Sequence, residues 1–270
     1  MKKYLVIGNP IEHSLSPLIH NHWMKQHHLV DSIYEKRKIE ENNLKNILNE
    51  IRNGEIVGMN VTVPFKKLII PFLDELDIFA EDTQSVNTVM KVKDKIVGYN
   101  TDSLGFGRTI DELYSKGDRV LDGKNIFILG GGGVTASIVS TLKQRGGNII
   151  ISNRTRSKVE ELKKLFPKIE VLDWGKKPKK YDIVINTTSV GLKKNDKIQI
   201  DFDDCSNNNK LFYDLIYNPK ETNFLKEARL RGNKTMNGQK MFLYQASYAF
   251  YIWTNILPKI DKDVIKLLDK

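Results

Sequence analysis

The chain has 270 residues, 40% of them hydrophobic, which is enough to bury the core of one large or two modest domains and argues against a disordered chain. Its net charge of +10 comes from lysines spread along the sequence, many beside glutamates in helical patterns, so solvated faces are favoured over a nucleic-acid surface. No apolar run reaches the roughly 18 residues of a membrane helix, and the N-terminus turns polar too soon for a signal peptide, so a cytoplasmic protein is expected.

The first hundred residues alternate between apolar, strand-like runs and segments of helical period. Strands are predicted at residues 3–8, 33–39, 56–63 and 86–92, and helices at residues 16–28 and 40–52. This alternation is typical of an α/β domain, which we expect over residues 1–102.

A second alternating series follows. Its predicted strands are apolar on both faces, as in a parallel sheet covered by helices, and lie at residues 125–129, 148–152, 181–186 and 211–215. The boundary should fall within a helix at residues 103–116, just after the first domain. We therefore expect a Rossmann-like domain over residues 103–238 and C-terminal helices over residues 239–270, the first of which packs back across the domain junction. The lysine-rich run at residues 176–180 contains a proline and is predicted to be a loop.

A glycine-rich turn stands between the predicted strand at residues 125–129 and the helix after it. Its sequence is Gly130-Gly131-Gly132-Gly133-Val134. Glycines at this place allow a tight turn and a close approach of the backbone to a pyrophosphate at the helix N-terminus. The third glycine of the G-x-G-x-x-G pattern falls on Thr135, so a bare glycine turn remains the alternative.

The next strand ends in a turn that carries two arginines and no acid: Asn153-Arg154-Thr155-Arg156. An Asp or Glu at this place would bind the ribose hydroxyls of NAD, whereas arginines can pair with a 2′-phosphate and stack on adenine. The turn therefore favours NADP. The alternative is that Thr155 caps a helix whose exposed face holds Arg156 and Lys158.

Two polar motifs in the first domain have residues that can handle a hydroxyl proton. The first runs from Asn60 through Thr62 to Lys66, and the second is Asn100-Thr101-Asp102. A proton-handling half that precedes a nucleotide-binding half suggests an oxidoreductase that interconverts a carbinol and a carbonyl. A surface ion pair is the alternative for Lys66 and Asp102.

The segment His13-Ser14-Leu15-Ser16-Pro17 offers hydroxyls without bulk. Ser16 before a proline is a reasonable helix N-cap, but a cap does not explain Ser14. The five histidines lack a metal-ligand spacing, so helix surface or local packing is favoured over zinc. The single cysteine, Cys205, has no partner for a disulfide or a metal site and is interpreted as incidental.

With these motifs the chain resembles the shikimate dehydrogenase family over nearly its full length. The resemblance implies reduction of 3-dehydroshikimate by NADPH with two catalytic residues, Lys66 and Asp102. It implies a set of substrate ligands, which are Ser14, Ser16, Asn60, Thr62, Asn87, Asp102, Tyr217 and Gln245. The implied NADP-binding residues are Gly130, Gly131, Gly132, Gly133, Val134, Asn153, Arg154, Thr155, Arg156, Thr188, Ser189 and Gly238.

The resemblance implies small-molecule ligands, no resident metal, no nucleic-acid partner, no membrane contact and a monomer or homodimer. This sequence departs from the family pattern at Gly131, where alanine is usual, at Lys240, where glycine is common, and at Ile78, where many members carry an acid. Three alternatives stay open: an NAD-dependent quinate/shikimate dehydrogenase, a non-catalytic NADPH sensor, and a methylenetetrahydrofolate dehydrogenase of related plan.

Overall fold

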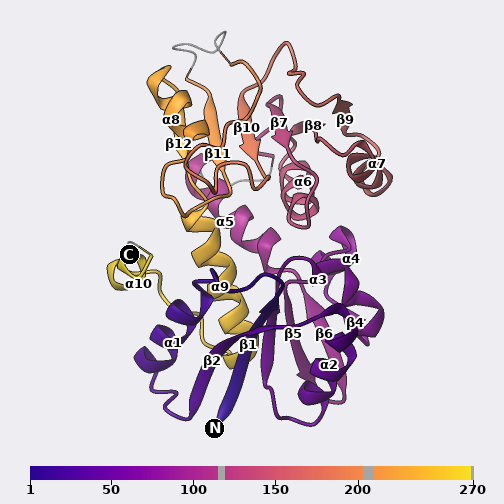
Figure 1. Ribbon diagram of the computed structural model, residues 1–270, viewed down its shortest axis with the longest axis vertical. Coiled ribbons are helices and arrows are strands. Elements are labelled where there is room, and N and C mark those ends of the chain that lie inside the picture. The colour runs from indigo at the N-terminus through magenta and orange to yellow at the C-terminus, as the bar shows by residue number, and fades with distance from the viewer. Residues whose placement is uncertain (115–118, 203–208, 269–270) are drawn as a thin grey trace. The chain divides into compact units, whose positions relative to one another are not determined.

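The computed structural model describes residues 1–114, 119–202 and 209–268, which form two compact units (Figure 1). Unit 1 comprises residues 1–105 and 243–270, and unit 2 comprises residues 106–242. The division falls within two helices, α5 (Thr101–Tyr114) and α9 (Gln239–Thr254). It lies a few residues after each of the boundaries expected from the sequence, because each helix contributes its first turn to one unit and the remainder to the other.

Unit 1 contains a six-stranded mixed sheet in the order β2-β1-β3-β5-β6-β4. Only β5 runs against its neighbours, pairing antiparallel with β3 and β6. The strands are β1 (Lys2–Gly8), β2 (Ser32–Lys38), β3 (Gly58–Val61), β4 (Glu75–Leu76), β5 (Thr88–Val92) and β6 (Lys95–Tyr99). The other helical segments of unit 1 are α1 (Ser16–Gln26), η1 (Glu41–Asn43), α2 (Leu44–Arg52), α3 (Phe65–Leu68), η2 (Ile70–Phe72), α4 (Ile78–Thr83) and α10 (Lys262–Lys266).

Helices α2 and α9 show how unit 1 closes its core. In α2 the buried residues recur at helical spacing, and they are Leu44, Ile47, Leu48 and Ile51. In α9 the ring of Trp253 lies directly on β3, where a Cβ added to Gly58 would come within 2.3 Å of the indole. This close approach explains why the C-terminal segment belongs to the same unit as the first strands.

Unit 2 has a sheet in which every strand is parallel, in the order β12-β11-β10-β7-β8-β9. Counted from β7, this is the doubly wound order 3-2-1-4-5-6 of dinucleotide-binding domains, with the switch point between β7 and β10. The strands are β7 (Asn125–Leu129), β8 (Asn148–Ser152), β9 (Glu170–Leu172), β10 (Ile183–Asn186), β11 (Leu211–Asp214) and β12 (Lys234–Met236). The helices are α6 (Thr135–Gln144), α7 (Arg156–Leu165) and α8 (Asn223–Leu230). The Rossmann-like expectation is confirmed.

Several predicted bounds differ from the observed ones. The predicted strands 125–129 and 148–152 are found unchanged, whereas β3 and β5 are shorter than predicted because each meets its partners only over a few residues. The strands β4, β6, β9 and β12 were not predicted as separate elements. Residues 176–180 form no helix or strand, as predicted. Cys205 and the end of the predicted helix 103–116 lie outside the described residues.

Candidate active site

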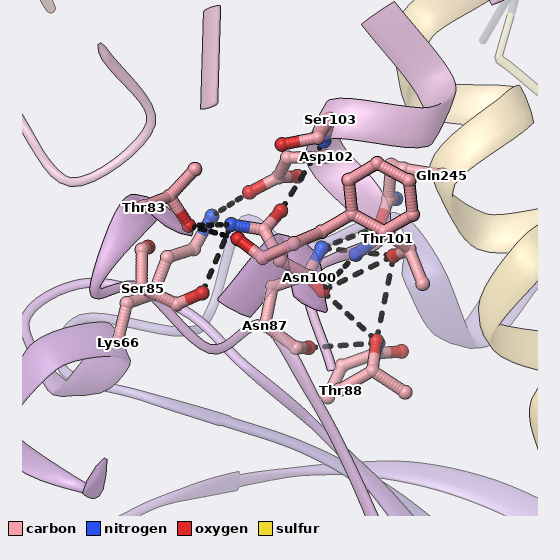
Figure 2. Close-up of polar contacts among 12 residues, drawn as sticks. Lys66, Thr83, Ser85, Asn87, Thr88, Asn100, Thr101, Asp102, Ser103 and Gln245 are labelled. Atoms are coloured by element: carbon pink, nitrogen blue, oxygen red, sulfur yellow. Dashed lines mark hydrogen bonds and ion pairs between the residues drawn. The ribbon is translucent and has the colours of Figure 1, made fainter. Parts of the chain in front are cut away.

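Lys66 and Asp102 form an ion pair in unit 1 (Figure 2). Lys66 Nζ lies 2.5 Å from Asp102 Oδ2, and the two side chains are only 12% and 8% exposed. A surface pair would be far more open to water, so that alternative for the two residues is wrong. A lysine and a carboxylate held together away from water can pass a proton to a substrate oxygen and stabilise the charge that remains.

Asn100 fixes the turn that carries Asp102. Its side-chain oxygen accepts from the backbone N–H of Ser103 at 3.2 Å, which caps the start of α5. Its amide donates to Thr83 Oγ1 at 2.8 Å and to the carbonyl of Ser85 at 2.9 Å (Figure 2). Asn100 is fully buried, so it positions Asp102 within the protein rather than presenting an amide at the surface.

Asn87 lies at the centre of a second network beside this pair (Figure 2). Its oxygen accepts from the backbone N–H of Thr101 at 2.8 Å and from Thr88 Oγ1 at 3.0 Å. Its amide donates to Thr101 Oγ1 at 2.9 Å and, over a longer 3.4 Å, to Gln245 Oε1. Two predicted substrate ligands far apart in sequence, Asn87 and Gln245, therefore meet in unit 1.

Asn60 on β3 is held from three sides. Both hydrogens of its amide are donated at 3.0 Å, one to the carbonyl of Asn87 and one to Thr88 Oγ1. Its oxygen accepts from the hydroxyl of Tyr34 at 2.6 Å. Asn60 can therefore offer a substrate only the remaining lone pair of its oxygen. Tyr34 gave no signal in the sequence beyond that of an ordinary strand residue.

Ser14 and Ser16 lie at the start of α1, as the sequence predicted. The N-cap of α1 is Leu15, and Ser16 is the first helical residue with a proline after it, so the predicted capping role of Ser16 is wrong. The backbone N–H of Ser16 donates instead to Ser14 Oγ at 3.4 Å. Ser14 and Thr62 are partly buried, and Ser16 is buried.

The histidines of α1 serve packing in at least one case. His20 is fully buried and stacks on Tyr34 with 4.3 Å between ring centroids and 10° between planes. Neither ring nitrogen has a hydrogen-bond partner among the described residues, and burial lowers the pKa of His20 to about 3. No group of three or more His, Cys, Asp and Glu within the described residues could hold a metal ion.

The glycine turn of unit 2 depends on its first glycine. Gly130 has φ +117°, and a Cβ there would lie 2.4 Å from Thr187 Oγ1. Thr135 Oγ1 lies 2.9 Å from Thr187 Oγ1, so a hydroxyl pair joins the start of α6 to the loop after β10 at the switch point. A Cβ on Gly132 would meet nothing within 4 Å, and one on Gly131 would lie 3.3 Å from the side chain of Lys158.

The arginine turn after β8 is exposed. Arg156 pairs with Glu160 at 2.7 Å and with Asp173 at 2.8 Å, while Arg154 makes no ion pair with a described residue. Thr155 is the N-cap residue of α7 but forms no side-chain capping bond, so its predicted capping hydrogen bond is absent from the described structure. Asn153 donates to the carbonyl of Thr155 at 2.8 Å, which closes the turn.

The later predicted positions of unit 2 differ in their surroundings. Thr188 Oγ1 donates to Asn186 Oδ1 at 2.7 Å, while Ser189 beside it is exposed. A Cβ on Gly238 would lie 2.0 Å from the carbonyl oxygen of Leu215, so only glycine fits there.

Tyr217 is the one predicted substrate ligand that belongs to unit 2. Its ring stacks on Phe242 with centroids 4.4 Å apart, and burial raises its pKa to about 12. The hydroxyl therefore stays protonated over the physiological pH range. Of the departures from the family pattern, Ile78 is 68% exposed, and Lys240 pairs with Glu112 at 2.8 Å.

The strand order of unit 2 is that of an α/β dinucleotide-binding domain, and unit 1 holds a buried lysine–carboxylate pair. Family models for the shikimate dehydrogenase substrate binding domain and for shikimate / quinate 5-dehydrogenase match residues 6–89 and 112–221. The shikimate dehydrogenase (NADP(+)) of Pelagibacter ubique (strain HTCC1062) is 48% identical over 269 residues, covering 99% of each chain. The chain belongs to the shikimate dehydrogenase family, so the resemblance seen in the sequence is confirmed.

Solved structures of shikimate dehydrogenases are similar to this chain over its whole length. Shikimate dehydrogenase from Aquifex aeolicus is 34% identical with a TM-score of 0.88, and the match covers 100% of this chain and 98% of that one. Shikimate 5-dehydrogenase from Thermus thermophilus, in complex with NADP(H) and shikimate, is 28% identical with a TM-score of 0.87, and the match covers 100% and 99%. No helix in the described parts of this chain is long and apolar enough to cross a membrane.

Proposed function

We propose that this chain catalyses the reversible, NADPH-dependent reduction of 3-dehydroshikimate to shikimate, a step of aromatic amino acid biosynthesis. The buried Lys66–Asp102 pair carries this proposal, because the reaction needs a proton donor beside the carbonyl that is reduced. Two relatives that match this chain over nearly their full lengths are named for this NADP-linked activity.

Lys66 is the proposed proton donor in reduction and the proton acceptor in oxidation. Bound NADPH supplies the hydride, and negative charge then develops on the substrate oxygen. Lys66 donates its proton to that oxygen, while Asp102 keeps the ammonium in place through their 2.5 Å contact. In the reverse direction the neutral amine of Lys66 accepts the hydroxyl proton.

The remaining unit 1 residues are proposed to orient the substrate. Ser14, Ser16 and Thr62 offer hydroxyls to its carboxylate. Asn87 and Gln245 are joined by a hydrogen bond of 3.4 Å, which is long and therefore weak, so a bond to a substrate hydroxyl can replace it. Asn60 accepts from a hydroxyl through its remaining lone pair, and Tyr217 is proposed as a further substrate ligand.

NADP binding is proposed for unit 2. The turn from Gly130 to Val134 lies at the switch point between β7 and β10, where a pyrophosphate binds in folds of this order. Asn153, Arg154, Thr155 and Arg156 are assigned to the 2′-phosphate and adenine, and Thr188, Ser189 and Gly238 to the remainder of the cofactor. In these terms residues 1–102 with 239–270 bind the substrate, and residues 103–238 bind NADP. We further propose a cytoplasmic enzyme that is a monomer or homodimer.

Replacement of Lys66 tests the proposal. Lys66→Ala should lower kcat by about 10²–10⁴, the usual loss when a general acid/base is removed. The variant should still bind shikimate and NADP+, measured by calorimetry, because Lys66 contributes little to the core. Lys67→Ala, at the exposed next position, is the matched control and should keep kcat within about twofold.

Asp102→Asn provides the second arm of this test. It keeps the shape of the side chain and removes the charge that holds the lysine, so it should lower kcat and raise KM for shikimate. A near-normal kcat in folded Lys66→Ala would reject the assignment of the proton donor. An effect of Asp102→Asn confined to KM for NADP+ would place Asp102 outside the substrate site.

A further inference from the structure

Tyr34 joins three elements of unit 1 near the predicted carboxylate pocket. It lies on the edge strand β2 and is only 1% exposed. The side chain of Asn21 on α1 binds both sides of its backbone, donating to the carbonyl of Tyr34 at 2.8 Å and accepting from its N–H at 2.9 Å. The ring stacks on His20, also on α1. Tyr34 is therefore fixed against the helix that begins with Ser16.

The directions of the hydrogen bonds around Tyr34 can be assigned. The carbonyl of Asn87 can only accept, so the amide nitrogen of Asn60 must face it, and the amide oxygen must face Tyr34. The hydroxyl hydrogen of Tyr34 therefore goes to Asn60.

We propose that Tyr34 is a positioning residue of the substrate site, whose hydroxyl holds the side chain of Asn60 on β3 in a fixed orientation for the substrate. This inference rests on the proposed function.

Tyr34→Phe removes only the hydroxyl and tests this role. KM for shikimate should rise by about fivefold or more, while kcat and KM for NADP+ stay within about twofold. The matched control is Tyr4→Phe, which removes another buried hydroxyl of unit 1, from a ring that contacts Trp253 in the same aromatic cluster. The control should leave all three constants within about twofold of the wild type.

A double variant separates positioning from general destabilisation. If Tyr34 acts through Asn60, the KM for shikimate of Tyr34→Phe with Asn60→Ala should not exceed that of the worse single variant by more than about twofold. Three results would overturn the inference. The first is a double-variant effect equal to the product of the two single effects. The others are an unchanged KM for shikimate in folded Tyr34→Phe and an equal rise in KM for shikimate and KM for NADP+.

A measurement on the wild-type protein covers the case in which Tyr34→Phe does not fold. With tyrosine labelled with ¹³C at Cζ, the Tyr34 resonance should shift on saturation with shikimate, and that of Tyr213 in unit 2 should not. An unmoved Tyr34 resonance at saturation would contradict the inference. The rate of NADP+ reduction by shikimate with the wild-type protein tests the proposed function independently, since that measurement does not depend on the role of Tyr34.

Discussion

The proposed site residues of unit 1 and the arginine turn of unit 2 differ in how far their side chains are buried and already hydrogen-bonded to other protein groups. In unit 1 the amides of Asn60, Asn87 and Asn100 are buried and hydrogen-bonded, and the Lys66–Asp102 pair is almost closed to water. In unit 2 the turn from Arg154 to Arg156 is exposed, and Arg156 pairs with surface carboxylates.

The site proposed for the substrate is therefore more preorganised than the turn proposed for the 2′-phosphate of NADP. On the proposed assignment, substrate binding needs only local exchanges, such as the replacement of the long Asn87–Gln245 bond. At the arginine turn, Arg156 must give up Glu160 and Asp173 to reach a phosphate, and exposed ion pairs of this kind hold it only weakly. Arg154 needs no such exchange.

The largest expected effect that separates the two regions is loss of cofactor preference. Arg154→Ala with Arg156→Ala should lower kcat/KM for NADP+ by at least about tenfold, since each arginine offers charge-assisted hydrogen bonds to a 2′-phosphate. NAD+ kinetics should stay nearly unchanged. Arg154→Ala alone should cost more than Arg156→Ala, because Arg156 loses carboxylate partners when it binds phosphate.

The control for this experiment is Arg229→Ala, which removes an exposed arginine of unit 2 that pairs with Glu221 at 2.8 Å. It should leave both cofactors unaffected. If the double variant keeps the preference for NADP+, the two arginines are surface charges, and the contrast between the regions has no bearing on cofactor choice.

The second prediction concerns how the free energy of unfolding depends on pH through His20 in unit 1. The pKa of His20 is depressed in the folded protein, from 6.5 to about 3, so its contribution to stability is complete above pH 6.5 and is lost as pH falls toward 3. Between pH 7 and pH 5 the wild type should lose about 2 kcal/mol more free energy of unfolding than His20→Phe. Urea titrations at the two pH values measure the difference. Equal losses of unfolding free energy in the two proteins would show that His20 is accessible to water.

The third prediction compares two helix caps of unit 2. Thr222 is buried, accepts from the N–H of Leu225 at 3.4 Å and donates to Asp214 at 2.6 Å, whereas Thr155 has no capping bond. Thr222→Ala should lower the free energy of unfolding by about 1–3 kcal/mol, and Thr155→Ala by less than about 0.5 kcal/mol. Equal losses in chemical denaturation would show that the exposed turn is as tightly held as the buried network.

The sequence predicted the two α/β halves and the doubly wound domain because both depend on periodic apolar patterns, as in β7 and β8. It also predicted Lys66 and Asp102 as a pair, since each ends a polar motif. It could not predict the partners Tyr34 and Thr101, because their importance arises from register and from contacts between distant segments. The capping role expected of Ser16 was wrong because the helix begins at Ser16 itself. The part played by each predicted ligand remains a prediction.

The most direct test of the central claim is the initial rate of reduction of NADP+ and of NAD+ by the wild-type protein with shikimate and with quinate. We predict rapid reduction of NADP+ with shikimate and a kcat/KM at least about tenfold higher with NADP+ than with NAD+. A preference for quinate with NAD+, or the absence of reduction with either cofactor in a protein that binds NADP+, would contradict it.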